Sequence, residues 1–226
     1  MSLQKELLSH QNKIKAKFLS GFFKTGKGQY GEGDIFLGIN VPTQRLIAKK
    51  YKDLDLKSLL KILRSKYHEF RLTSLLILVE KYKTSLGREK KEIVNLYLSC
   101  AKNINNWDLV DLSAPNILGD YFKDKDRSVL YALAKSNNLW EKRISIISTL
   151  AFIKTGDFAD TLKISKALLG DTNDLIHKAV GWMLREVGKK NESTLLNFLD
   201  KNYKTMPRTS LRYAIERLDQ NKKFTT

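Results

Sequence analysis

Apolar residues recur along most of the chain at the three- and four-residue steps of an α-helix. The segment 174–189 shows this most clearly, with an apolar stripe made of Leu175, Ile176, Ala179, Val180, Met183, Leu184 and Val187. Alternating β-branched runs, which are typical of strands, are few, and the chain has only 3 prolines. The pattern therefore predicts an all-α protein.

The periodic segments divide the chain into a series of helices. The first is predicted over 3–24 and is followed by a glycine-rich loop at 26–34. Further helices are predicted at 43–51, 56–66, 70–83, 88–102, 105–112, 114–122, 127–136, 139–154, 158–169, 174–189, 192–203 and 207–218. Short linkers in the second half are typical of antiparallel helix pairs. We predict one domain over residues 1–226, a right-handed α-solenoid of antiparallel HEAT-like helix pairs with a concave basic face.

The charge balance points to an anionic partner. The chain carries 41 Lys+Arg against 24 Asp+Glu, a net charge of +17. Such a field attracts nucleic acid or anionic lipid, although a solvated lysine-rich surface explains the same numbers. No apolar run approaches the roughly 18 residues of a membrane span. The N-terminus lacks the apolar core of a signal peptide, so we expect a cytoplasmic protein that does not bind a membrane.

Metal and nucleotide cofactors are not predicted. The single cysteine, Cys100, excludes an intramolecular disulfide, and the 3 histidines lack metal-ligand spacing. The segment 26–31 formally matches G-x-G-x-x-G, but a helix precedes it and no βαβ unit follows. A linker is the simpler interpretation of this loop, and contact of Lys24 and Lys27 with phosphate is the alternative.

One short helix sets an aromatic side chain beside an acid. Trp107 and Asp111 are four residues apart, so on a helix they project from one face. An aromatic surface beside a carboxylate suits a cationic, electron-poor ligand or transition state.

Cationic residues form a second group of candidates. Lys178, Trp182, Arg185 and Lys189 follow one face of the 174–189 helix, opposite its apolar stripe. Packing of Trp182 on a neighbouring helix is the alternative. Arg143 interrupts the apolar line of 139–154 and is expected to pair with Asp111 or Glu186, or to reach a phosphate. Arg208 and Arg212 share a face of the last helix, which suits contact with a duplex backbone or a solvated surface.

Five motifs occur together in a characteristic order. They are Phe36-Leu37-Gly38-Ile39-x-x-Pro42-x-x-Arg45, Trp107-Asp108-x-Val110-Asp111, Leu118-Gly119-Asp120, Leu139-Trp140-x-x-Arg143 and Lys178-Ala179-x-Gly181-Trp182-x-Leu184-Arg185-Glu186. In this combination the chain resembles the AlkD-like family of DNA alkylation repair proteins, which are built from HEAT-like repeats.

The resemblance implies an activity and a set of site residues. Members of the family excise cationic N3- and N7-alkylpurines, such as 3-methyladenine and 7-methylguanine, from duplex DNA without extruding the base. The resemblance implies that Trp107, Asp111 and Trp182 contact the deoxyribose at the lesion. It also implies that Arg143 and Arg185 bind the DNA backbone. We expect a monomer without cofactor or metal. Our interpretation of the residues agrees, since Asp111 would stabilise an oxocarbenium-like sugar.

The N-terminal region departs from the family. Founding members carry a second N-terminal helix with a lesion-facing aromatic residue just before the first motif. Here that place is taken by 24–34, where 4 glycines disfavour a helix. The chain then resembles a branch that lacks this helix, unless Tyr30 substitutes for its aromatic residue. A non-catalytic binder of damaged or branched DNA and a protein-interaction solenoid are therefore the alternative functions.

Overall fold

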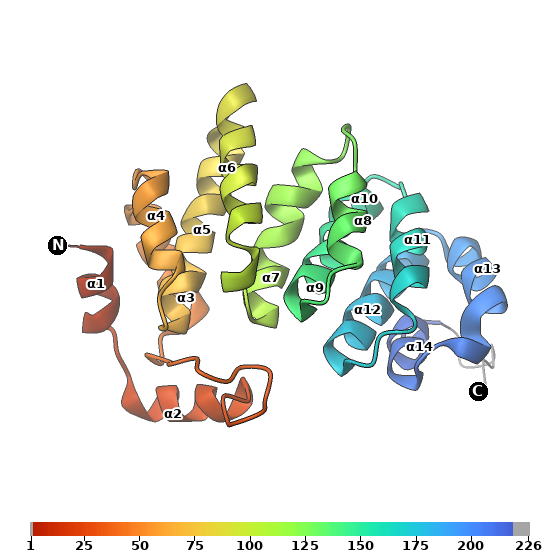
Figure 1. The fold of residues 1–226 in the computed structure, drawn as a ribbon, viewed down its shortest axis with the longest axis horizontal. Helices are drawn as coiled ribbons and strands as arrows, with labels where there is room; N and C mark the ends of the chain where they lie inside the picture. Colours follow the sequence, from red (N-terminus) through yellow and green to blue (C-terminus); the bar gives the residue numbers. More distant parts are fainter. Residues whose placement is uncertain (1, 219–226) are drawn as a thin grey trace. The chain divides into compact units, whose positions relative to one another are not determined.

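The computed structural model describes residues 2–218. Within that range its regular elements are helices, joined by turns and irregular segments, and an isolated parallel bridge links Ile35 and Tyr67 (Figure 1). The predicted all-α class is confirmed. The chain divides into two compact units, Met1–Ser113 and Ala114–Thr226. The prediction of one solenoid domain over 1–226 with a concave basic face stays a prediction, and residues 1 and 219–226 lie outside the described part.

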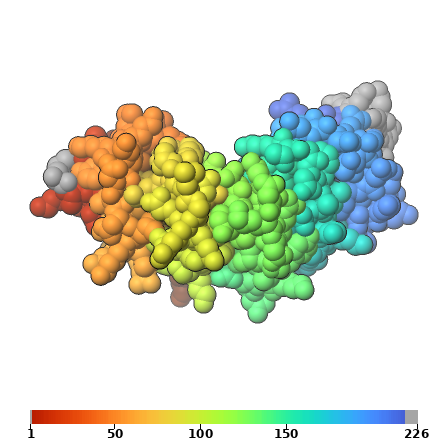
Figure 2. All heavy atoms as spheres, turned by 90° about the horizontal axis from the view of Figure 1, so that it is seen from above, coloured from red at the N-terminus to blue at the C-terminus, as the bar shows by residue number. Residues whose placement is uncertain are grey.

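The first unit is organised around one long buried helix. Its elements are α1 (Leu3–Ser9), α2 (Lys13–Phe22), α3 (Val41–Lys50), α4 (Leu56–Leu63), α5 (His68–Thr84), α6 (Gly87–Ser99), a 3₁₀ turn at Ala101–Asn103 and α7 (Trp107–Ala114). The helix α5 packs against α1, α3, α4 and α6, and it is buried on nearly all sides because apolar residues surround it. Residues 41–99, orange to yellow in Figure 2, form one continuous packed body.

The second unit is organised around α12. Its elements are a π-helical segment at Pro115–Gly119, α8 (Ser128–Ala134), α9 (Leu139–Ser148), α10 (Leu150–Lys154), α11 (Ala159–Leu168), α12 (Asp174–Lys190), α13 (Glu192–Asn202), a 3₁₀ turn at Tyr203–Thr205 and α14 (Arg208–Ile215). The helix α12 packs against α9, α11, α13 and α14. At Gly181 a Cβ atom would lie 2.5 Å from the Ser210 carbonyl oxygen, so glycine permits the close approach of α14.

The prediction of one helix over 3–24 is wrong. The helix ends at Ser9 and a new one, α2, begins at Lys13. Asn12 causes the break, because its side chain accepts a hydrogen bond from the Lys15 N–H at 2.9 Å and caps α2. Its own N–H donates to the Leu37 carbonyl at 2.8 Å. A second N-terminal helix therefore precedes the glycine-rich loop, which the sequence analysis did not expect.

The glycine-rich loop itself contains no helix, as predicted. It is a series of turns closed by its own groups, including bonds from the Gly31 N–H to the Lys24 carbonyl at 3.1 Å and from the Gly28 N–H to the Glu32 carboxylate at 2.8 Å.

The first family motif follows this loop and is fixed by one buried carboxylate. Glu69 of α5, which is 1% exposed, accepts hydrogen bonds from the N–H groups of Leu37 at 2.9 Å, Gly38 at 2.8 Å and Ile39 at 3.2 Å.

Other predicted boundaries shift for local reasons. The helix predicted over 139–154 is divided into α9 and α10 at Thr149, whose hydroxyl donates to the Ile146 carbonyl at 2.7 Å. The helix predicted from residue 105 begins at Trp107, and the one predicted over 114–122 has a π-helical centre. Within the described residues, no helix has the length and apolar character needed to cross a membrane.

Candidate active site

The start of α7 is built by Asn106. Its carbonyl accepts the Val110 N–H at 3.2 Å, and its side-chain oxygen accepts the Trp107 N–H at 2.9 Å. This capping fixes the first turn, where Trp107 and Asp111 are one turn apart on the same helix and are both half-buried. The relationship predicted from their spacing is confirmed.

An aromatic cluster supports the indole of Trp107. The Phe23 ring stacks on it with centroids 5.1 Å apart and an interplanar angle of 12°. The Phe22 ring meets it edge-on at 6.1 Å. Phe23 also stacks on Phe36 at 4.9 Å, so the indole rests on a continuous aromatic layer.

Asp111 lies near a buried tyrosine of α6. Burial is the main cause that raises the pKa of Tyr97; a hydrogen bond with Ser113 lowers it, and the negative charge of Asp111 raises it further. The Tyr97 hydroxyl and the Ser113 hydroxyl are 2.8 Å apart. Tyr97 is thus a neutral group near the acid.

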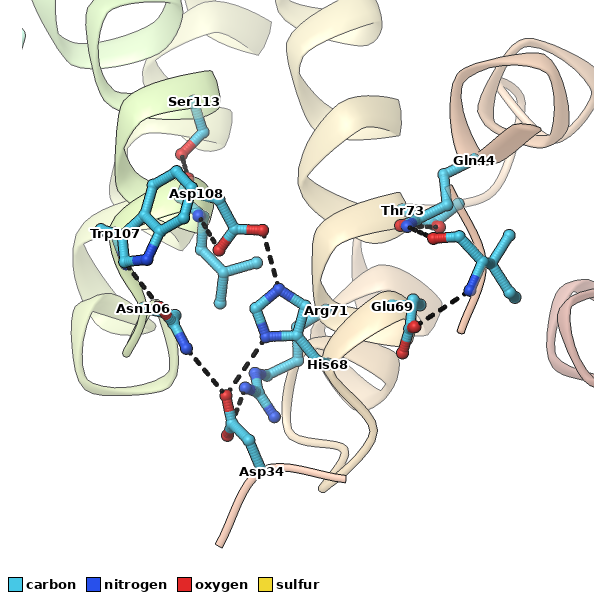
Figure 3. A network of polar contacts seen from close by, with 12 residues as sticks. Asp34, Gln44, His68, Glu69, Arg71, Thr73, Asn106, Trp107, Asp108 and Ser113 are labelled. Carbon is cyan, nitrogen blue, oxygen red and sulfur yellow. Dashed lines mark hydrogen bonds and ion pairs between the residues drawn. The ribbon is translucent and has the colours of Figure 1, made fainter. Parts of the chain in front are cut away.

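A buried polar cluster lies beside Trp107 (Figure 3). We call Asp34, His68, Arg71, Asn106 and Asp108 the His68 cluster. The imidazole Nδ1 is 3.2 Å from Asp34 and Nε2 is 2.8 Å from Asp108. The Arg71 guanidinium donates a hydrogen bond to Asp34 at 2.6 Å. The Asn106 side-chain amide also donates to Asp34, at 3.2 Å.

The His68 cluster shifts two pKa values. Burial lowers the pKa of His68, but the charge and hydrogen bond of Asp108, with the bond to Asp34, outweigh it and raise the pKa to about 9. Burial raises the pKa of Asp34, yet the His68 hydrogen bond and the Arg71 charge bring it below its usual value. Both groups are therefore charged at neutral pH.

The helix α2 presents an unusual surface. None of its side chains is buried. Ile14, Phe18 and Phe22, which are spaced four residues apart, are 85%, 70% and 56% exposed. Lysines at positions 13, 15 and 17 flank them. Exposed aromatic rings among cations are typical of surfaces that bind nucleic acid.

The predicted stripe of α12 is confirmed as a half-exposed face opposite the buried apolar stripe. The Trp182 indole N–H donates to Glu186 at 3.1 Å, and Lys189 donates to the same carboxylate at 2.7 Å. Arg185 pairs with Glu216. Lys178 pairs with Asp174 at 2.7 Å.

The remaining predicted cations lie on α9 and α14. Arg143 is 5% exposed, and its guanidinium donates to the Leu175 carbonyl at 2.6 Å, a bond that the sequence analysis did not foresee. Arg208 and Arg212 are exposed. The cations predicted on α9, α12 and α14 thus lie in the second unit, whereas Trp107 and Asp111 lie in the first. The roles of all these residues toward a ligand stay predictions.

Comparison with known proteins decides the family. A family model described as "DNA alkylation repair enzyme" matches residues 3–218. The chain belongs to this family. Membership in a DNA alkylation repair enzyme family implies a DNA substrate, which agrees with the net charge of +17.

Solved structures show the same fold. A predicted DNA alkylation repair enzyme from Enterococcus faecalis matches with a TM-score of 0.71 and 15% identity, covering 93% of this chain and 98% of that one. AlkD2 from Streptococcus mutans matches with a TM-score of 0.58 and 17% identity, covering 96% of this chain and 100% of that one. The search of curated proteins gave no match.

The residues that support the site were not predicted from the sequence. No role was assigned to His68, Asp34 or Asp108, and Phe22 and Phe23 lay within the single helix predicted over 3–24. A signal was present, because His68 and Arg71 lie just before the unbroken apolar run 75–79 of the same helix.

Proposed function

We propose that this DNA alkylation repair enzyme hydrolyses the N-glycosidic bond of cationic N3- and N7-alkylpurines in duplex DNA, with 3-methyladenine and 7-methylguanine as substrates. Asp111 is the catalytic carboxylate. Trp107 and Trp182 contact the sugar at the lesion, while Arg143, Arg185, Lys178, Lys189, Arg208 and Arg212 bind the phosphate backbone.

The chemistry needs few groups. An alkylated purine that already carries a positive charge leaves as a neutral base, so no strong general acid is required. The bond breaks through an oxocarbenium-like sugar, as in glycoside hydrolysis. The Asp111 carboxylate stabilises that cation and orients a water molecule, and the indole face of Trp107 attracts it.

The observation that carries the proposal is the pairing of Trp107 and Asp111 on α7. Both side chains are half-buried and one turn apart, and Trp107 is backed by the stacked ring of Phe23 at 5.1 Å. A rigid aromatic face beside a carboxylate suits a flat, cationic reacting group, because little reorganisation is needed when the charge develops.

A base-release assay tests this proposal. Methylated duplex DNA is incubated with wild-type protein, with Asp111→Asn and with Asp53→Asn, which removes an exposed acid of the same unit. Release by wild type and Asp53→Asn, with loss in Asp111→Asn, supports the proposal. Absence of release by wild-type protein that binds the duplex contradicts it.

A second candidate is a non-catalytic binder of damaged or branched DNA. The exposed aromatic and lysine side chains of α2 favour it, because they supply affinity without needing Asp111. This function predicts strongly salt-dependent binding with a preference for DNA structure and no base release. Weak DNA binding at about 0.15 M salt would instead favour the protein-interaction solenoid.

A further inference from the structure

The His68 cluster joins three segments that are far apart in the sequence. Asp34 ends the glycine-rich loop, His68 and Arg71 lie in the first turn of α5, and Asn106 and Asp108 lie at the start of α7. His68 is 2% exposed, and both carboxylates are also buried. Its backbone N–H donates to the Ile35 carbonyl at 2.9 Å, so the loop is attached to α5 through main chain and side chain alike.

The protonation of His68 follows from its geometry. Each ring nitrogen faces a carboxylate oxygen, at 3.2 Å for Asp34 and 2.8 Å for Asp108. A neutral imidazole has one N–H and could donate to only one of them, whereas an imidazolium donates to both. With Arg71 as the second cation, two positive and two negative charges balance, while a neutral His68 would leave one buried negative charge uncompensated.

The groups that face the His68 ring come from every neighbouring element. The charged ones are Asp34 from the loop, Arg71 from its own helix and Asp108 from α7. Two aromatic rings cover it, those of Phe36 with centroids 4.4 Å apart and of Phe23 at 5.1 Å. Phe23 is also the ring that stacks on Trp107.

The cluster holds both neighbours of Trp107 in the chain. Asn106 donates its amide to Asp34 at 3.2 Å while its side-chain oxygen caps Trp107. Asp108 accepts from the imidazole through one oxygen and from the Leu109 N–H through the other, at 2.9 Å. The direction in which α7 begins is thus determined from both sides of Trp107.

We propose that His68, as an imidazolium bridging Asp34 and Asp108, is a positioning residue that fixes the start of α7 and so aims Trp107 and Asp111 at the sugar. The inference rests on the function proposed above for those two residues. His68 itself is buried and touches no substrate. It acts through Asp108, Asn106 and the ring of Phe23.

The first test uses spectroscopy and needs no activity. The chain has 3 tryptophans, so a Trp140→Phe, Trp182→Phe background leaves Trp107 as the emitter. In that background, His68→Gln is expected to shift Trp107 emission and to increase its quenching by acrylamide, while His10→Gln, an exposed histidine, leaves both unchanged. Adding Asp108→Asn to His68→Gln removes the surplus negative charge and is expected to reverse at least half of the change.

Nitrogen NMR of the ring is the second test. At pH 7.5 His68 is expected to show the shifts of an imidazolium, with His10→Gln and His177→Gln serving for assignment. A neutral His68 ring, or a folded His68→Gln protein with unchanged Trp107 emission and quenching, overturns the proposal. If His68→Gln does not fold, Asp108→Asn alone, which removes one bridge contact, must shift Trp107 emission or the proposal fails.

Base release then connects position with chemistry. Without its imidazolium bridge, His68→Gln is expected to lower kcat on the order of 10-fold or more, because a small misplacement of reacting groups is costly, with duplex affinity unchanged within about 2-fold. An unchanged kcat contradicts the proposal. If wild-type protein releases no base, the proposed function fails, and the emission and NMR results still decide the role of His68.

Discussion

Phe23 lies parallel to Trp107, with ring centroids 5.1 Å apart and an angle of 12° between the rings. The contact joins the end of α2 to the start of α7. Phe22, the last residue of α2, meets the same indole edge-on at 6.1 Å and stacks on the exposed Phe18 ring at 6.3 Å, so the exposed rings of α2 are connected with Trp107. Several expected effects of substitution depend on this connection.

The buried Phe23 and the exposed Phe18 should respond differently to substitution. Phe23 is 7% exposed and Phe18 is 70% exposed. We expect Phe23→Ala to cost about 3–5 kcal/mol of stability, as for other buried aromatics, and Phe18→Ala to cost less than about 0.5 kcal/mol. Urea unfolding measures both.

For DNA affinity we expect the opposite order, with Phe18→Ala weakening duplex binding more than Phe23→Ala in protein that remains folded. Phe18→Ala is expected to weaken duplex binding several-fold, measured by fluorescence anisotropy, because the exposed ring then no longer supplies an apolar contact with the DNA. Full affinity in Phe18→Ala would show that α2 does not contact DNA.

Gly38 is required for the docking of α2. It has a φ of +83°, and a Cβ atom there would lie 2.2 Å from the Asn12 carbonyl oxygen and 2.6 Å from the Ala16 nitrogen. Gly28 has a similar φ of +75° but open space around it. Gly38→Ala should therefore destabilise the protein more than Gly28→Ala, which bears only the backbone strain of about 1–3 kcal/mol. Equal unfolding midpoints in urea would contradict the clash.

Stability should depend on the charge of His68. Its pKa is raised from 6.5 to about 9 in the folded protein, so its contribution is complete below pH 6.5 and is lost as the pH rises through about 9. Between pH 6 and 9.5 the free energy of unfolding of wild-type protein should fall by more than that of His68→Gln. Parallel pH curves for the two proteins would exclude a charged His68.

The surface cations should affect salt dependence. Arg212 is exposed on α14, and if it binds a phosphate, Arg212→Gln should weaken binding to all duplex sequences and lower the slope of log K against log salt by about 1. Lys52, an exposed lysine of the first unit that we did not assign to DNA, is the control, and Lys52→Gln should leave the slope unchanged. An unaltered slope in Arg212→Gln would remove it from the interface.

The regular helices could be predicted because the spacing of apolar residues that indicates a helix involves only residues close together in the sequence. The apolar stripe of α12 recurs at helical spacing, and the structure buries that stripe as expected, except for the half-buried Leu175. Trp107 and Asp111 were predicted to share a face for the same reason, since two positions on one helix are related by its geometry alone.

The features that escaped prediction depend on contacts between distant segments. The break at Asn12 is stabilised by a hydrogen bond to Leu37, which no local pattern reveals. The His68 cluster requires residues 34, 68 and 108 to meet. Periodicity describes one helix at a time, so a buried network between a loop and two helices leaves only scattered polar residues in the sequence.

The central claim is that Asp111 performs the chemistry, and the single-turnover rate of base release tests it most directly. With wild-type protein in excess over duplex DNA that contains 7-methylguanine or 3-methyladenine, we expect release well above the spontaneous rate. Asp111→Asn should be slower by roughly 10²–10³, with the duplex Kd unchanged within about 3-fold. Release by Asp111→Asn at the wild-type rate would contradict the account.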